Sequence, residues 1–135
     1  MNLNTLIAEP NTPLLTWCKS NIDMLHERLR SDGVIHLRGF QSEANDFADF
    51  LYSFGGPLLQ DAFWSTPRKH VSANTFTATE YDNKRTIHLH SEMSYANAWP
   101  RLVAFQSLKA ASQGGQTTLG DISKITEALG DILQP

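Results

Sequence analysis

The sequence has 135 residues, of which 41% are hydrophobic, and a formal net charge of −3 at pH 7. This length allows at most one domain, and the apolar fraction excludes a disordered chain. The charge and the lack of a basic cluster interleaved with aromatics give no sign of a nucleic-acid or membrane-surface partner. No apolar run is long enough to span a bilayer, and residues 1–13 lack the pattern of a secretory signal peptide.

Cys18 is the only cysteine in the sequence. An intramolecular disulfide and a zinc site built on several thiolates are therefore excluded. With no signal peptide, this composition predicts a cytoplasmic, reducing compartment. Cys18 lies in an apolar stripe at helical spacing, which favours a buried small residue over a nucleophile.

The first predicted element is a helix. Thr12 is a suitable N-cap and Pro13 suits the first helical position. Apolar residues then recur at helical spacing as far as Leu29. The helix is expected to end at residues 31–33, where Gly33 allows a left-handed turn.

A strand and a second helix are predicted next. Residues 34–40 begin with β-branched side chains, which favours a short strand, and Gly39 is expected to close it. Ser42 is the expected cap of a helix with phenylalanines and a leucine on one face. The Gly-Gly-Pro sequence at residues 55–57 should stop this helix.

The remainder is predicted to be rich in β-structure, with a turn at residues 82–84 and a final helix capped by Asp121. This order favours α+β or a β-sandwich over a βαβ fold. Roughly six short strands fall short of the about eight in a closed jelly roll. Open sheet edges of this kind are sticky, so a homo-oligomer is compatible with the pattern. The expected strands cover residues 71–81, 85–90, 101–108 and 117–119.

Two residues in the middle of the chain are candidate metal ligands. If the strand continues through residue 91, His90 and Glu92 share one face. Imidazole nitrogen and carboxylate oxygen suit a divalent first-row metal, and a further histidine would complete the facial triad of Fe(II) oxygenases. The spacing alone is weak, because 5 histidines and 14 acidic residues give roughly half a chance occurrence of His-x-acid. There are two alternatives. His90 and Glu92 are ordinary polar residues of a strand, or His88 and His90 form a competing ligand pair, which nothing nearby completes.

Three longer segments occur in a distinctive order: "GVIHLRGF", "TATEYDNKRTIHLHSEMSYANAWP" and "RLVAFQSLKAASQGGQTTLGD". In order and spacing they resemble the taurine dioxygenase-like (TauD/TfdA) family of Fe(II)/2-oxoglutarate-dependent dioxygenases. The resemblance runs from about Gly33 to Leu129. It implies an α+β fold, a partial double-stranded β-helix (jelly roll) with flanking N-terminal helices. Residues 1–135 would be the N-terminal portion of such a domain, which is apparently truncated.

The resemblance also implies two cofactors, Fe(II) and 2-oxoglutarate. His90 and Glu92 match the first two iron ligands of the family. Thr117, which follows Gly114 and Gly115, matches the threonine that contacts 2-oxoglutarate. A glycine pair allows a tight turn, and a hydroxyl can donate to a carboxylate. Without the family context an ordinary turn would be the preferred interpretation.

Glu92 stands where most family members have aspartate. This resembles the subgroup that hydroxylates amino acids, free or carrier-bound, in natural-product pathways. The implied partners are an amino-acid-like small molecule and O2. Related halogenases lack a carboxylate at this position, so Glu92 favours hydroxylation or a related oxidation.

Further pocket candidates are weaker, because turn, strand or core packing explains each of them singly. Arg68, Lys69 and His70 are expected in a solvated loop. The candidates for substrate contact are Asn74, Thr77, Glu80, Tyr95 and Trp99.

The family also needs a second histidine for iron and an arginine for the distal carboxylate of 2-oxoglutarate. No histidine follows His90 in this sequence. Three interpretations remain. The chain is the N-terminal part of a hydroxylase, or a degenerate dioxygenase fold kept as a binding or scaffold module, or a structural protein with a chance metal pair. The first interpretation accounts best for the ordered motifs.

Overall fold

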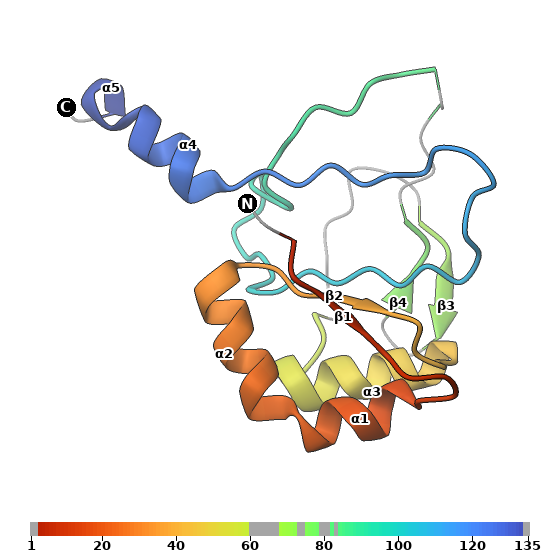
Figure 1. The fold of residues 1–135 in the computed structure, drawn as a ribbon. Helices are drawn as coiled ribbons and strands as arrows, with labels where there is room; N and C mark the ends of the chain where they lie inside the picture. The colour runs from red at the N-terminus through yellow and green to blue at the C-terminus, as the bar shows by residue number, and fades with distance from the viewer. Residues whose placement is uncertain (1–2, 60–67, 73–74, 79–81, 83, 134–135) are drawn as a thin grey trace.

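The computed structural model describes residues 3–59, 68–72, 75–78, 82 and 84–133, and every structural statement below concerns those residues. Helices and short strands alternate in the N-terminal half, whereas much of the C-terminal half is irregular (Figure 1). None of the described helices is long and apolar enough to cross a membrane. The elements in chain order are β1 (Thr5–Ile7), α1 (Leu14–Ser20), α2 (Ile22–Asp32), β2 (His36–Arg38), α3 (Ala44–Gly55), β3 (His70–Ser72), β4 (Thr75–Phe76), α4 (Ile122–Ala128) and α5 (Gly130–Leu133).

The first predicted helix is two helices, broken at Asn21. Asn21 has φ −121° and ψ 21°, so it ends α1 and begins α2. Its side-chain amide donates to the Trp17 carbonyl at 2.8 Å, a local bond by which asparagine competes with helical hydrogen bonding. The expected N-cap is also off by one residue, because Pro13 is the cap of α1 and the Thr12 hydroxyl bonds to a preceding carbonyl. The left-handed end at Gly33 is confirmed, with φ 72°.

A strand that the sequence analysis missed lies at the N-terminus. β1 pairs in parallel with β2, and Leu6 is opposite Leu37 in the register. Three residues are too few to show the alternation that identifies a strand. The parallel pairing of β1 and β2 around two helices is a βαβ-type connection, which the predicted order of elements did not favour, whereas β3 and β4 pair antiparallel.

The predicted second helix is confirmed as α3, with a shifted start. Its N-cap is Glu43 rather than Ser42, and a capping box forms because Glu43 and Asp46 each accept from the other's backbone N–H. The helix ends at Gly55, and Gly56 follows with φ 83°. Stacking of His26 on Phe54, with 4.3 Å between ring centroids, joins α2 to α3.

The core is formed by the first two helices under the small parallel sheet. Leu14, Cys18 and Leu25 are 7%, 1% and 0% exposed. α1 lies beside α3, and the β1–β2 pair packs against the buried residues of α1 and α2 (Figure 1). The partly buried hydrophobic residues packed against this cluster are Leu6, Trp17, Met24, Ile35, Leu37, Phe40, Phe50 and Phe54.

Three expected strands do not form in the part of the chain that the structure describes. Residues 85–90, 101–108 and 117–119 make no strand ladder. A strand exists only when a second strand takes up its backbone hydrogen bonds, and no described segment does so here. The 71–81 expectation is met in part by β3 and β4, and residues 73–74 and 79–81 lie outside the described residues. The partial jelly roll accordingly stays a prediction.

Residues 101–108 instead run along α3 in the opposite direction. The Gln106 side-chain amide donates to Ser42 Oγ at 3.0 Å, just before α3. At the other end, Leu102 lies against Gly55, where an added Cβ would be 3.2 Å from Leu102 Cδ1. The segment therefore covers α3 while much of its own apolar surface stays in solvent, since Phe105 is 67% exposed.

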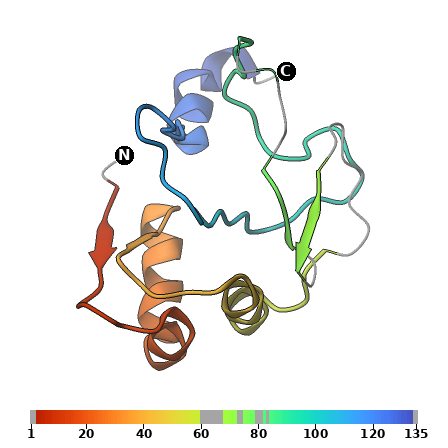
Figure 2. The ribbon, with the colours of Figure 1, turned by 90° about the vertical axis from the view of Figure 1, so that its right-hand side faces the viewer.

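The last helical region is capped as predicted. Asp121 accepts from the backbone N–H groups of Ser123 and Lys124 at 3.1 and 3.5 Å. α4 and α5 extend away from α1 and α3 in both ribbon views (Figures 1 and 2). Their apolar side chains consequently remain exposed, with Ile132 at 78%.

Leu25→Ala should lower the free energy of unfolding by about 2–5 kcal/mol, because it leaves a cavity at a fully buried position. Leu108→Ala is the matched control, since Leu108 is 67% exposed and its truncation should cost little. Urea unfolding of the three proteins measures the difference. Equal losses in the two variants would contradict the placement of the core.

Cys18 should be inert toward thiol reagents in the folded protein. Burial raises the pKa of its thiol from the ordinary 9.0 to about 11, so little thiolate exists at pH 8. Between pH 9 and 11 the unfolded thiol ionises while the folded one does not, so the stability contributed by the buried neutral thiol is lost across that window. Rapid labelling by a disulfide reagent without denaturant would contradict this, and labelling in guanidinium chloride is the control.

Candidate metal centre

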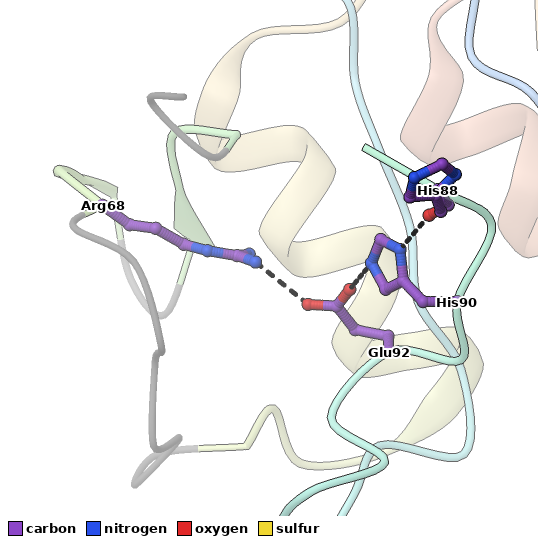
Figure 3. Close-up of polar contacts among 4 residues, drawn as sticks. All are labelled: Arg68, His88, His90 and Glu92. Carbon is purple, nitrogen blue, oxygen red and sulfur yellow. Dashed lines mark hydrogen bonds and ion pairs between the residues drawn. The ribbon is translucent and has the colours of Figure 1, made fainter. Parts of the chain in front are cut away.

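His90 and Glu92 converge although their segment is not a strand. The distance between His90 Nε2 and Glu92 Oε2 is 3.5 Å (Figure 3). The expected convergence is thus present, while the strand that was expected to produce it is absent.

The chain turns sharply after Glu92, around Met93. Met93 is 3% exposed and has φ 57°, a left-handed conformation that is unusual for a residue with a bulky side chain. Such a conformation costs of order 1–3 kcal/mol, and burying a methionine side chain contributes about 1.5–3 kcal/mol in return. Turn hydrogen bonds from Ser94 to Ser91 and from Ala96 to Met93 fix the loop. The buried Met93 therefore anchors the segment that carries both candidate ligands.

The His90 ring is oriented by a local backbone contact. Its Nδ1 lies 2.8 Å from the carbonyl oxygen of His88. A carbonyl only accepts, so Nδ1 carries the proton in this hydrogen bond and a neutral ring keeps its lone pair on Nε2. Metal-binding histidines use the same arrangement, with one ring nitrogen on the metal and the other donating to a carbonyl or carboxylate.

Glu92 has a second partner on the side away from His90. Arg68 Nη2 lies 2.9 Å from Glu92 Oε1, and the two side chains are 17% and 27% exposed (Figure 3). The expectation of a solvated loop at residues 68–70 is therefore wrong for Arg68. For His70 the loop is wrong, because this residue belongs to β3 with its ring edge-on to Phe76, but the side chain is exposed as expected. Only the fold brings Arg68 to Glu92, because they are 24 residues apart.

The donor atoms of this pair suit a divalent metal. Two ligands bound at about 2.1 Å stand about 3.0 Å apart in octahedral geometry and about 3.4 Å apart in tetrahedral geometry. The observed 3.5 Å needs only a small closure. One nitrogen and one anionic oxygen also match the ligand preference of Fe(II) and its neighbours in the first transition row.

The two residues do not gather a third ligand from the described chain. Within that part, no group of three or more His, Cys, Asp and Glu side chains is placed to hold a metal ion. His88 contacts His90 through its backbone carbonyl, and the alternative ligand pair of His88 and His90 stays an open alternative.

Thr117 is the candidate contact to 2-oxoglutarate. It is exposed and follows Gly114 and Gly115, whose positive φ angles of 69° and 76° lie in the left-handed region that favours glycine. Among the described residues it makes no hydrogen bond to His90 or Glu92. Its role with 2-oxoglutarate stays a prediction.

Three of the five substrate-contact candidates lie among the described residues. Thr77 accepts a hydrogen bond from the Lys69 N–H at 2.9 Å and so supports the β3–β4 hairpin. Tyr95 and Trp99 are 58% and 65% exposed, which rules out core packing for both and leaves contact with a substrate untested. Asn74 and Glu80 lie outside the described residues.

Comparison with known proteins places these residues in context. Residues 4–134 match the family described as "Taurine catabolism dioxygenase TauD, TfdA family". The dapdiamide synthesis protein DdaC of Enterobacter agglomerans is 29% identical over 108 residues, which cover 79% of this chain and 33% of that protein. The clavaminate synthase-like protein At3g21360 of Arabidopsis thaliana is 30% identical over 109 residues, again 79% and 33%. The chain thus spans about a third of the length of these relatives. No solved structure matches.

The ligand assignment predicts that Co(II) binding falls more than about tenfold in His90→Ala and in Glu92→Ala, because each removes one donor atom. His88→Ala is the matched control and should keep its affinity, since His88 acts through its backbone carbonyl. Titration followed by Co(II) absorbance or calorimetry measures the three affinities. A loss in His88→Ala as large as that in His90→Ala would favour the alternative histidine pair.

Proposed function

Because this chain belongs to the TauD/TfdA dioxygenase family, we propose that it carries the first half of the iron site of an Fe(II)/2-oxoglutarate-dependent oxygenase. The observation that carries the proposal is the convergence of His90 Nε2 and Glu92 Oε2 at 3.5 Å. The family match supports reading these donors as iron ligands rather than as a chance polar pair. The third ligand, a histidine, and the arginine for 2-oxoglutarate would come from a part of the domain that this sequence does not include.

Each residue of the pair has a distinct task in this proposal. The His88 carbonyl holds the His90 ring so that the Nε2 lone pair points at the site. Glu92 supplies the negative charge that offsets part of the charge of a divalent cation, and Met93 anchors the turn behind it. Fe(II) bound there with 2-oxoglutarate would supply the O2-dependent oxidation that yields succinate, carbon dioxide and a hydroxylated product.

Thr117 is the proposed contact to 2-oxoglutarate from this chain. Its hydroxyl can donate to a carboxylate, and the left-handed turn at Gly114 and Gly115 presents it. An added Cβ at Gly115 would lie 2.9 Å from the Ala111 Cβ, so the turn has no room for a larger residue there.

The proposed substrate is an amino-acid-like small molecule in a biosynthetic pathway. One relative is named for dapdiamide synthesis and the other for its likeness to clavaminate synthase, which supports a biosynthetic role. Glu92 supports hydroxylation or a related oxidation, because a carboxylate ligand occupies the position that halogenases leave for chloride.

A catalytically inactive dioxygenase fold, kept as a binding or scaffold module, is the second candidate. The observation in its favour is that the described residues gather only two ligands. Iron-dependent turnover separates the two candidates.

The test is succinate formation from 2-oxoglutarate by the protein expressed from its native reading frame, with its intact mass measured. The proposed enzyme should need Fe(II), and His90→Ala should abolish succinate. Succinate formation that persists in His90→Ala would refute the ligand assignment. A protein that forms no succinate with Fe(II) present would support the scaffold module.

Thr117→Ala should weaken 2-oxoglutarate binding about tenfold or more, because a hydrogen bond to a charged group contributes about 1.5–3 kcal/mol. Thr118→Ala is the adjacent control and should bind 2-oxoglutarate like the parent protein. Titration of 2-oxoglutarate into the Co(II)-loaded protein measures both variants. Equal affinities in Thr117→Ala and the parent would contradict the proposed contact.

A further inference from the structure

We propose that Arg68 is a positioning residue for Glu92. The Arg68 guanidinium holds one carboxylate oxygen of Glu92, so that the other carboxylate oxygen faces His90. The proposal rests on the metal site proposed above and assigns it a residue outside the His-x-Glu motif. Arg68 itself would not contact the metal.

The two oxygens of Glu92 have different partners on opposite sides. Oε1 lies 2.9 Å from Arg68 Nη2, and Oε2 lies 3.5 Å from His90 Nε2 (Figure 3). The last torsion of a glutamate side chain is broad and close to two-fold, so a free carboxylate samples many orientations. A charge-assisted hydrogen bond to one oxygen removes much of that freedom. The direction of the second oxygen is then fixed as well.

The burial of the pair favours a fixed geometry over a fluctuating surface contact. The Arg68 and Glu92 side chains are 17% and 27% exposed, whereas the His90 side chain is 55% exposed. Water therefore screens the charges of the Arg68–Glu92 ion pair less than it screens a charge on the side of the site that His90 faces. The arginine supports the carboxylate from the protein side and leaves the side of His90 accessible.

Both ends of the ion pair are attached to ordered structure. Arg68 directly precedes the β3–β4 hairpin, and β3 lies against α3. Glu92 sits in the turn anchored by the buried Met93. The contact thus joins two segments that no shared sheet connects in the described chain.

The charge of Arg68 has an opposing effect, since a guanidinium repels a nearby cation. Two features favour the positioning effect. The guanidinium lies across the carboxylate from His90 rather than on the metal side, and the metal side is open to screening water (Figure 3). Hydrogen-bond partners of metal ligands typically raise metal affinity by about 10–100-fold. Loss of Arg68 should therefore weaken binding despite relieving repulsion.

The experiment compares Co(II) affinity in the parent, Arg68→Lys, Arg68→Met and the control Arg101→Met, which removes an exposed arginine. The expected order is parent, then Arg68→Lys, then Arg68→Met, with the last about 10–100-fold weaker. Lysine keeps the charge but lacks the planar fork, so it should rescue only in part. Arg101→Met should match the parent. Affinity in Arg68→Met equal to or tighter than that of the parent would overturn the proposal.

A second measurement on the metal-free protein separates this proposal from the metal site itself. The ring-nitrogen NMR signals of His90, assigned with His90→Ala, should shift in both Arg68→Met and Glu92→Gln but not in Arg101→Met. Unchanged His90 signals in Arg68→Met would overturn the positioning role. If the His90 signals shift in the variants as expected but the parent protein binds no Co(II), the proposed function is overturned and the positioning role stands. Thermal melting checks that each variant folds. If Arg68→Met does not fold, Arg68→Lys is compared with the parent instead.

Discussion

The rest of the structure depends on the burial of Leu14, Cys18 and Leu25 under the β1–β2 pair. This cluster fixes α1 against α2, and α3 then packs on α1. α3 supports the later segments of the chain, because β3 lies against it and residues 101–108 run along it. The candidate ligands belong to a loop between these supported segments. The positions of His90 and Glu92 therefore depend on a core to which neither residue belongs.

Local signals in the sequence predicted the helices well, because capping and apolar spacing act within a few residues. The ends at Gly33 and Gly56 and the cap at Asp121 follow from such signals. The break at Asn21 was missed because the apolar stripe continues across it and only the side-chain bond to Trp17 favours the interruption. The strands were predicted less well, because a strand forms only when two segments pair through their backbone hydrogen bonds. Residues 85–90 have the alternation but lack a partner in the described chain, whereas β1 has a partner but is too short to show alternation.

The candidate site shows the same division between local and non-local information. Spacing and family resemblance pointed to His90 and Glu92, and the two side chains do converge, although the chain makes a turn at Met93 and forms no strand there. The His88 carbonyl contact is local in sequence but depends on a backbone conformation that strand periodicity did not predict. Arg68 could not be predicted at all, because the chain between it and Glu92 must fold back before the ion pair exists.

Under the proposed function, metal affinity and the burial of the C-terminal apolar residues are linked. Leu89 is 60% exposed beside the candidate ligand His90, and Phe105 and Leu108 are each 67% exposed farther along. Exposed hydrophobic side chains on consecutive segments mark surface that another part of a domain or a partner covers. In the proposed complete domain, the polypeptide that supplies the third ligand would also pair with these segments. Iron would then bind most tightly where that surface is covered, and each event would stabilise the other by the same free energy.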